Sequence, residues 1–291
     1  MIDRSLHHYA SSFRSEIVRC RNADGRLTSL FCKYGAGPLQ PERGLRGGVR
    51  YEAEVYSKIL VPLQVSVPHF YGAHKDAETG LTWLMLGLVN GRRIGMNRDL
   101  VAAARWLGHF HTRGEALASG AEAVFLGRYD AELLSGFARR TLEFIHSGRK
   151  RCSWLATVCE RFETELLGAL VDEPVIIHGE YYRHNVLHRR ERIFPVDWES
   201  AALAAGEVDL GHLLEAWPPR VVAAALLAYC EARWPAGAPP EFERRLDIAR
   251  LYVHFRWLGD RQDWTGEEDS GWRLADMRSV AERLGILENR K

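Results

Sequence analysis

The sequence predicts an α+β protein of two lobes, in which a small antiparallel sheet precedes a mostly helical second part. Two observations lead to this prediction. Up to Val89, short alternating or apolar segments are separated by turn residues, as in an antiparallel sheet. After Gly91, long segments carry apolar residues at helical spacing, and only two short apolar runs interrupt them. We therefore expect an N-terminal lobe at residues 1–88 and a C-terminal lobe at residues 89–291.

The first lobe is predicted to contain four strands and one helix. Residues 16–21 alternate between apolar and polar side chains, and residues 27–34 return after a turn as the second strand of a hairpin. Residues 49–63 carry apolar side chains at the spacing of a helix. Two further strands are predicted at residues 69–74 and 82–89, the second ending at a turn pair, Asn-Gly.

The second lobe is predicted to be helical around a central pair of short strands. The apolar runs that form these strands lie on either side of residues 178–185. The predicted helices cover residues 100–111, 130–146, 152–171, 208–216, 220–234, 241–260 and 272–284. Small-molecule sites favour the boundary between two such lobes, so we expect a small-molecule cleft at the hinge near residues 88–92.

The composition limits the partners of the chain. Of its 291 residues, 46% are hydrophobic and 26% are charged, as in ordinary globular proteins. The 39 basic and 38 acidic residues give a formal net charge of +1, so we expect neither nucleic acid nor an anionic membrane as a partner. The first eight residues lack the apolar core of a secretory signal, and the longest apolar run, residues 221–229, is too short to cross a bilayer. Five scattered cysteines favour reduced thiols and a cytoplasmic location.

One stretch carries most of the chemical information. It begins His178-Gly179-Glu180, continues to Asn185 and reaches Asp197 twelve residues later. Transfer of a γ-phosphoryl group needs a carboxylate that accepts the proton of the attacking hydroxyl, and metal ligands that neutralise the phosphates. Magnesium prefers hard oxygen ligands such as carboxylates. Single acids near strands are usually surface residues, but acid, amide and acid in this order predict a phosphoryl-transfer site.

The stretch resembles the signature of the aminoglycoside phosphotransferase and choline kinase-like superfamily. That signature reads His-Gly-Asp, four residues, Asn, and then an apolar-Asp-Trp/Phe-Glu segment. Other segments resemble the family in the same order, and they are residues 30–34, 50–56, 83–91, 106–111 and 209–211. The resemblance covers nearly the whole chain. It implies a bilobal protein-kinase-like fold with a small antiparallel-sheet N-lobe above a mostly helical C-lobe.

The resemblance also implies roles in nucleotide binding. Lys33 would contact the nucleotide phosphates and pair with Glu52, although a solvated strand lysine is the alternative. The apolar neighbours of Lys33 in the sequence favour burial and therefore a partner. Glu54 competes with Glu52 for the role of that partner. Leu86 and Leu88 in the hinge would receive the purine.

The catalytic roles implied by the resemblance fall on the central stretch. Glu180 would be the base, and Asn185 and Asp197 would hold Mg²⁺. Glu199 would be a further metal ligand or a support for one, with a surface position as the alternative.

Other family positions concern the loops. His178 and Asp209 would brace the catalytic loop, and Arg183 would touch phosphate or remain solvated. The loop that would cover the nucleotide, residues 9–15, contains no glycine. Ser11 and Ser12 could instead present donors to the phosphate oxygens, and an ordinary N-terminal turn is the other interpretation.

Glu180 departs from the family pattern, which has aspartate at this position. The carboxylate is kept on a longer stem. A misplacement of about 1 Å can cost on the order of 10²-fold in rate, and a general base contributes roughly 10²–10⁴-fold. We therefore predict an ATP- or GTP-dependent phosphotransferase that acts on a small-molecule hydroxyl. The alternative is a weakly active or inactive homologue that binds nucleotide or a partner.

The acceptor is predicted only as a class. An aminoglycoside, an amino alcohol or another metabolite would fit the family, and the oligomeric state is open. The acids of residues 260–269 lie beside Trp257, Trp264 and Trp272, and such a surface could bind a cationic acceptor. A solvated acidic loop is the alternative. The histidines at 178, 184 and 188 lack the further ligands of a zinc site and are interpreted as loop residues.

Overall fold

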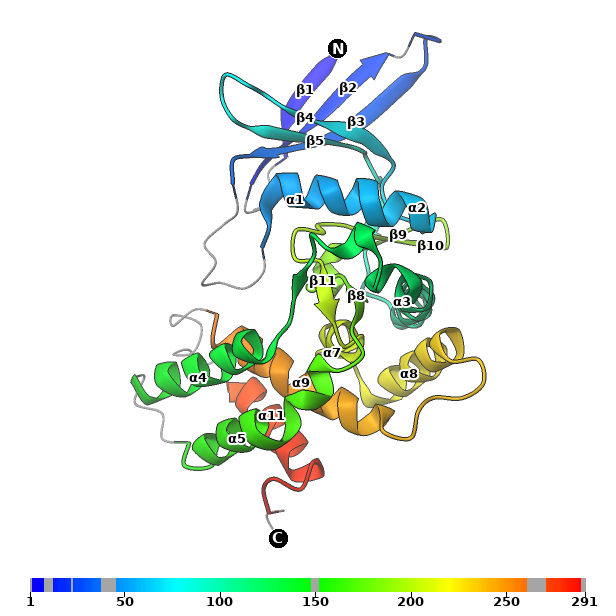
Figure 1. Ribbon diagram of the computed structural model, residues 1–291. Helices are drawn as coiled ribbons and strands as arrows, with labels where there is room; N and C mark the ends of the chain where they lie inside the picture. Colours follow the sequence, from blue (N-terminus) through cyan, green and yellow to red (C-terminus); the bar gives the residue numbers. More distant parts are fainter. Residues whose placement is uncertain are drawn as a thin grey trace.

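The computed structural model describes residues 2–7, 13–21, 23–37, 46–147, 152–260 and 271–288. Its N-terminal and C-terminal parts lie one above the other, with the two chain ends at opposite extremes of the molecule (Figure 1). Ser11 and Ser12 lie outside the described residues, as does most of the acidic segment 260–269. Across the described ranges, no helix is both long enough and apolar enough to span a bilayer.

The upper part is an antiparallel five-stranded sheet (Figure 1). The strands are β1 (Asp3–Leu6), β2 (Arg14–Arg21), β3 (Leu27–Gly35), β4 (Phe70–Lys75) and β5 (Thr82–Gly87), in the order β1-β2-β3-β5-β4. Four of them match the sequence prediction; β1 was not predicted, because all of its side chains are exposed and it carries no apolar pattern. Gly25, at a φ of +82°, makes the turn between β2 and β3. The register places Lys33 opposite Leu84 at the centre of the sheet.

One helical segment lies under the sheet (Figure 1). It consists of α1 (Gly48–Val55), a π-helical turn (Tyr56–Leu60) and α2 (Val61–Leu63). Its inner face buries Val55, Tyr56, Ile59 and Leu60 completely, which fixes the helix against the sheet and the second lobe. Substantial apolar burial of this kind holds Glu52, one turn earlier, at the interface between the lobes.

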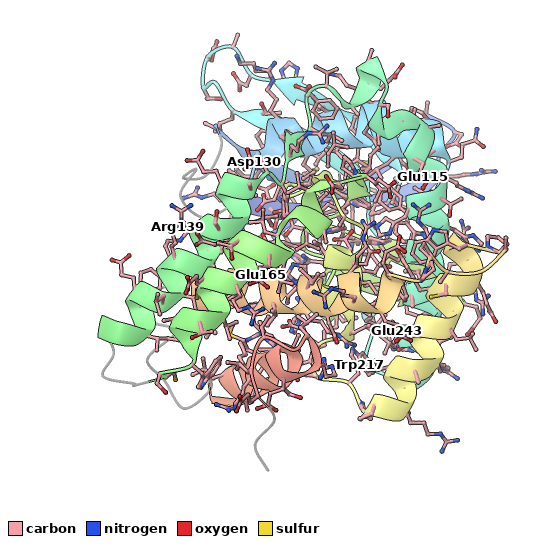
Figure 2. The ribbon with its side chains drawn as sticks, turned by 60° about the horizontal axis from the view of Figure 1, so that its bottom comes forward. Glu115, Asp130, Arg139, Glu165, Trp217 and Glu243 are labelled. Carbon is pink, nitrogen blue, oxygen red and sulfur yellow. The ribbon has the colours of Figure 1, made fainter. Side chains whose placement is uncertain are left out.

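The lower part is mostly helical. The long helices are α3 (Asn97–Ala118), α4 (Ala131–Ser147), α7 (Glu207–Leu214), α8 (Pro219–Arg233), α9 (Phe242–Leu258) and α11 (Gly271–Arg283). Shorter helical segments are α5 (Leu155–Arg161), a π-helical turn (Phe162–Leu166), α6 (Gly168–Val171), and 3-10 turns at Ala121–Ala123 and Arg183–Asn185. The predicted helices all correspond to helical segments here. Helix α9 is buried along most of its length and forms the centre of the lobe, with α4, α7 and α11 packed around it (Figure 2).

Two small sheets hold the loops between the lobes. One contains β6 (Arg92–Arg93), β9 (Val186–Arg189) and β10 (Arg192–Pro195), in the order β10-β9-β6. The other contains β7 (Gly127–Arg128), β8 (Val175–Ile177) and β11 (Ala202–Ala204), in the order β7-β11-β8. The residues predicted to be catalytic lie on the connections between these strands. The bilobal α+β architecture is as predicted, and the domain boundary near residue 88 stays a prediction.

Candidate active site

A cavity of about 530 Å³ lies between the sheet and the helical part. It is lined from above by β3 and β5, and from below by the segment after β8 and the segment after β10. Six of the predicted site residues border it: Lys33, Glu52, Leu86, Leu88, Asn185 and Asp197. Its size falls within the range of roughly 300–1,000 Å³ that small-molecule sites occupy. These six predictions therefore meet at one cavity, whereas Glu180 is not among the described residues that line it.

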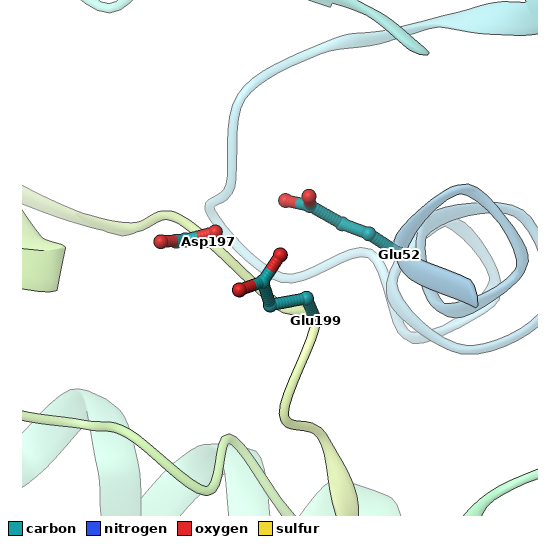
Figure 3. A group of neighbouring side chains, drawn as sticks. All are labelled: Glu52, Asp197 and Glu199. Atoms are coloured by element: carbon teal, nitrogen blue, oxygen red, sulfur yellow. The ribbon is translucent and has the colours of Figure 1, made fainter. Parts of the chain in front are cut away.

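Lys33 lies at the centre of a charged cluster. Its Nζ donates to Glu52 at 2.8 Å, to Asp197 at 2.6 Å and to Glu199 at 3.1 Å. Glu52 approaches from α1, while Asp197 and Glu199 come from the segment after β10, and the three carboxylates face one another (Figure 3). Lys33, Glu52 and Glu199 are almost fully buried, and a third of the Asp197 side chain is exposed. Asp197 is therefore the most exposed member of the cluster.

The pKa values of this cluster reflect burial and charge. Burial alone would lower the pKa of Lys33, but the three carboxylates raise it well above its ordinary value. Burial raises the pKa of Glu52 and brings that of Glu199 to about 7, despite the neighbouring ammonium. For Asp197 burial acts in the same direction, but Lys33 prevails and the pKa is lowered. Asp197 is thus the carboxylate that stays ionised most readily.

The donor set fits a hard divalent cation. One oxygen from each of Glu52, Asp197 and Glu199 lies within 4.8 Å of the others. Asn185 borders the same cavity, and its Nδ2 donates to the Glu180 carbonyl at 3.2 Å, which turns the amide NH₂ away from any metal and leaves Oδ1 as a ligand atom. Carboxylate and amide oxygens are the ligands that Mg²⁺ takes. A single ammonium balances three carboxylates here, so a divalent cation would reduce a remaining negative charge.

The loop that carries Glu180 is held from behind by Asp209 of α7. The backbone N–H groups of His178 and Gly179 donate to the Asp209 carboxylate at 2.6 and 2.9 Å, and His111 Nε2 lies 3.6 Å from it. Gly179 has a φ of +82°, and a Cβ there would lie 2.1 Å from the Ser200 carbonyl oxygen. These contacts fix the direction in which the loop presents Glu180. The bracing position predicted for His178 and Asp209 is therefore present.

Glu180 directly follows Gly179, and both oxygens of its carboxylate accept hydrogen bonds. Its Oε1 accepts hydrogen bonds from Arg46 at 3.0 Å and from Arg256 at 3.2 Å, and its Oε2 accepts one from the Tyr182 hydroxyl at 3.3 Å. Burial would lower the pKa of Arg256, but Glu180 and Asp260 raise it above its ordinary value. The carboxylate in the position of the base is thus paired with two guanidinium groups.

The structure resolves two alternatives that the sequence left open. Glu54 is on the outer face of α1, where it pairs with Arg50 and Lys58, so Glu52 is the partner of Lys33. Glu199 is buried against Lys33, so its predicted alternative, a surface position, is wrong.

Arg46 and Arg256 were missed from the sequence. Arg46 follows a glycine- and proline-rich loop, and Arg256 belongs to a helix without a clear apolar face. Neither pattern signals that the residue contacts Glu180.

Comparison with known proteins agrees with this geometry. The model of the phosphotransferase enzyme family matches residues 39–245, which is more than half of the chain. The chain belongs to this phosphotransferase family. No curated protein sequence matches it at a significant level.

Solved structures of phosphotransferases share the fold. A macrolide 2'-phosphotransferase from Brachybacterium faecium is 20% identical, with a TM-score of 0.62 over 99% of this chain and 93% of that one. A choline/ethanolamine kinase family protein from Mesorhizobium loti is 17% identical, with a TM-score of 0.66 over 97% and 90%. Amicoumacin kinase, solved with AMP-PNP, Ca²⁺ and its substrate, is 10% identical, with a TM-score of 0.64 over 98% and 90%. At such identities the likeness establishes the protein-kinase-like fold.

A second, smaller cavity of about 180 Å³ adjoins the catalytic loop of this phosphotransferase family member. We call it the loop-side pocket. It is bordered by Tyr182, Arg183 and His184 of the catalytic loop, by His212 of α7, and by Trp257 and Arg273 of the last helices. His184 also borders the larger cavity, so the two spaces meet at the catalytic loop. Arg183 thus borders the loop-side pocket and is not among the described residues that line the larger cavity.

Proposed function

We propose that this protein is a phosphotransferase that moves the γ-phosphoryl group of ATP or GTP to a hydroxyl group of a small molecule. The observation that supports this most directly is the cluster of Lys33 with three carboxylates at the wall of the cavity between the lobes. A cation that reaches nucleotide phosphates, together with oxygen ligands for a metal, is what phosphoryl transfer requires from a protein. Family membership supports the same reaction class.

The nucleotide would enter the larger cavity with its purine against the hinge. Leu86 and Leu88 border the cavity at one end, and Lys33 and Asp197 border it as well. We propose that the lobes meet at this hinge, near residue 88. The structure of amicoumacin kinase with AMP-PNP and Ca²⁺ supports a nucleotide donor and a divalent cation in this fold.

Asn185 and Asp197 are the proposed ligands of Mg²⁺, and the buried Glu199 supports them through Lys33. The ion would neutralise charge on the phosphate oxygens when bound. Lys33 then serves two purposes. It holds Asp197 and Glu199 in place before the nucleotide arrives, and its ammonium group can shift toward the phosphates afterwards. Glu52 keeps Lys33 in position throughout, because its other oxygen also accepts the Trp198 backbone N–H at 3.1 Å.

Glu180 is the proposed base. The acceptor hydroxyl would give its proton to the Glu180 carboxylate, its oxygen would bond to the γ-phosphorus, and the bond from that phosphorus to the bridging oxygen would break to release the nucleoside diphosphate. Both oxygens of Glu180 accept hydrogen bonds in this structure. Oε1 accepts two donors, whereas Oε2 accepts one described donor, the Tyr182 hydroxyl, and so keeps a lone pair that could receive the proton.

Magnesium-dependent nucleotide binding tests the site. Asp197→Ala removes the ionised ligand at the cavity wall and should abolish the part of ATP binding that depends on Mg²⁺, as measured by calorimetry with and without EDTA. Asp76→Ala is the matched control, because Asp76 lies in the exposed turn between β4 and β5 and accepts only local hydrogen bonds. Unchanged binding in Asp197→Ala would show that the site is assigned wrongly.

A second candidate function is nucleotide binding without efficient transfer. The observation that favours it is the pairing of Glu180 with Arg46 and Arg256, which competes with proton acceptance. Glu180→Ala separates the two functions. In an active enzyme it should lower turnover by roughly 10²–10⁴-fold and leave nucleotide binding intact. Absence of any transfer by the wild type over a panel of amino sugars, amino alcohols and nucleosides would favour the second function.

The acceptor remains to be identified within the class of small hydroxyl compounds. Structural relatives act on macrolides, amicoumacin and choline or ethanolamine, according to their names. Fold alone does not fix the substrate. A cationic acceptor was one expectation from the sequence, and the residues of the loop-side pocket allow it to be evaluated. We further propose that the protein acts in the cytoplasm, in keeping with its five free cysteines.

A further inference from the structure

The loop-side pocket contains an arrangement of aromatic rings and charge that the proposed catalytic residues do not use. Arg273, at the start of α11, points its guanidinium group between two indole rings. Its central carbon lies 4.7 Å from the ring centroid of Trp257 and 4.4 Å from that of Trp272. Its Nη1 donates to Glu215, and its Nη2 lies 3.5 Å from the second oxygen of that carboxylate. About 14% of the Arg273 side chain is exposed.

Two indole faces and a carboxylate are the groups that bind an organic ammonium ion. In this protein the chain's own arginine already occupies the space between them. Glu215 is also largely buried, so the Arg273–Glu215 pair is screened little by solvent. An ammonium group of an acceptor would have to displace Arg273 from both rings and from its carboxylate.

No described carboxylate near the loop-side pocket is left to attract a cation. Glu215 is the one acid among the described residues that line it, and it is paired with Arg273. Glu180, which Tyr182 connects to the pocket, is paired with Arg46 and Arg256. Among the described lining residues, the other charged side chain is Arg183, a further cation. An organic cation would therefore meet arginines on this side of the loop.

We propose that Arg273 determines the acceptor specificity, so that the acceptor is a neutral or anionic hydroxyl compound and organic cations are excluded. The inference rests on the proposed function for the identity of the pocket as the acceptor side. The pocket borders the loop that presents Glu180, and Tyr182, which lines the pocket, donates its hydroxyl to the Glu180 carboxylate. Glycerol-like polyols and hydroxy acids belong to the class that the pocket would accept.

Choline is the probe for the space that Arg273 occupies beside Trp257 and Trp272, because it joins a hydroxyl group to a quaternary ammonium ion. Its binding is measured by calorimetry without nucleotide, so the result does not depend on turnover. Arg273→Ala should bind choline at least ~10-fold more tightly than the wild type, since the two indole faces and Glu215 become available. Arg273→Lys keeps a cation in the pocket and should bind choline as weakly as the wild type.

Arg278→Ala is the matched control. Arg278 lies on the same helix, over the ring of Trp154 at 5.8 Å, and pairs with Glu282 at 2.9 Å, but it does not border the loop-side pocket. Its replacement should leave choline binding unchanged. If Arg273→Ala does not fold, Arg273→Gln removes the charge and keeps a donor for Glu215, and the same gain is expected on a smaller scale.

Two results would overturn the inference. One is choline binding by the wild type as tight as that by Arg273→Ala, which would mean that the arginine excludes nothing. The other is phosphorylation of choline by the wild type at a higher rate than phosphorylation of both glycerol and glycerate. A failure of the proposed function gives a different result. It would appear as the absence of magnesium-dependent ATP binding, and the choline measurements would be unaffected.

Discussion

The two charged clusters on either side of the catalytic loop are opposite in composition. In the first, one buried ammonium, Lys33, faces three carboxylates. In the second, one carboxylate, Glu180, faces two guanidinium groups. The first cluster surrounds one ammonium with three carboxylates, and we propose that a divalent cation completes it. The second already satisfies its central carboxylate, so an acceptor must compete with arginines. We propose that the first cluster prepares nucleotide and metal binding in advance, whereas the arginines hold back the proposed base.

The largest expected effect comes from removing the single cation of the first cluster. Lys33→Met would leave three carboxylates buried together and should lower the free energy of unfolding by about 3–5 kcal/mol, the usual cost of breaking a buried ion pair. The measurement is urea unfolding followed by fluorescence. Lys58→Met is the control, because Lys58 pairs with Glu54 on the exposed face of the helical segment that carries Glu52. Its loss should change the free energy of unfolding by less than about 1 kcal/mol.

Addition of Mg²⁺ sharpens this prediction. A divalent cation can replace the missing positive charge among Glu52, Asp197 and Glu199, so it should raise the melting temperature of Lys33→Met more than that of the wild type. Equal stabilisation of both proteins would mean that the three carboxylates do not form a metal site. Equal stability of Lys33→Met and Lys58→Met would mean that Lys33 does not hold the cluster together.

The second effect concerns the loop that carries Glu180. Gly179 and Gly25 share a φ of +82°, but their surroundings differ: a Cβ at Gly179 would strike the Ser200 carbonyl, and a Cβ at Gly25 meets nothing within 4 Å. Gly25→Ala should cost about 1 kcal/mol from backbone strain alone. Gly179→Ala should cost at least about 2 kcal/mol more, and chemical unfolding of both variants measures the difference. Similar losses would show that the loop can move away from Ser200.

The fold, the first cluster and Glu180 were predictable from the sequence, and the two arginines that pair with Glu180 were not. Lys33, Glu52, Asn185 and Asp197 stand in short motifs next to strands or a helix, so local patterns and family resemblance located them. Arg46 and Arg256 contact Glu180 across sequence separations of 134 and 76 residues. Contacts between residues so far apart in the sequence depend on how the lobes and α9 pack. Neither Arg46 nor Arg256 lies in a motif. Arg273 is partly similar: Trp272 precedes it in the sequence, but Trp257 and Glu215 reach it only through the packing of the helices.

The third effect is a pH dependence on the acceptor side. Burial lowers the pKa of His212, which borders the loop-side pocket, to about 3. A histidine whose pKa is lower in the folded state stabilises the fold above its unfolded pKa of about 6.5, and this contribution is lost as the pH falls toward 3. The wild type should therefore lose about 2 kcal/mol of stability between pH 7 and pH 5 through His212.

His212→Phe should be free of this loss. The measurement is the free energy of unfolding at both pH values for the two proteins, and the difference between their pH dependences isolates His212 from other acid-sensitive groups. An identical pH dependence would mean that water or a neighbouring group stabilises the protonated ring in the folded protein.

The smallest effect tests how tightly the base is held. The Tyr182 hydroxyl donates to Glu180 Oε2 at 3.3 Å, a longer bond than those from the two arginines, and burial raises the pKa of Tyr182 so that it stays protonated. Tyr182→Phe should cost about 1 kcal/mol or less in stability. Because it frees the oxygen that no arginine contacts, it should leave kcat within a few fold of the wild type, or raise it, in an ATP-coupled assay with the best acceptor found. A loss of kcat as large as that of Glu180→Ala would mean instead that Tyr182 orients the carboxylate for proton transfer, and that the arginines do not hold it in its working position.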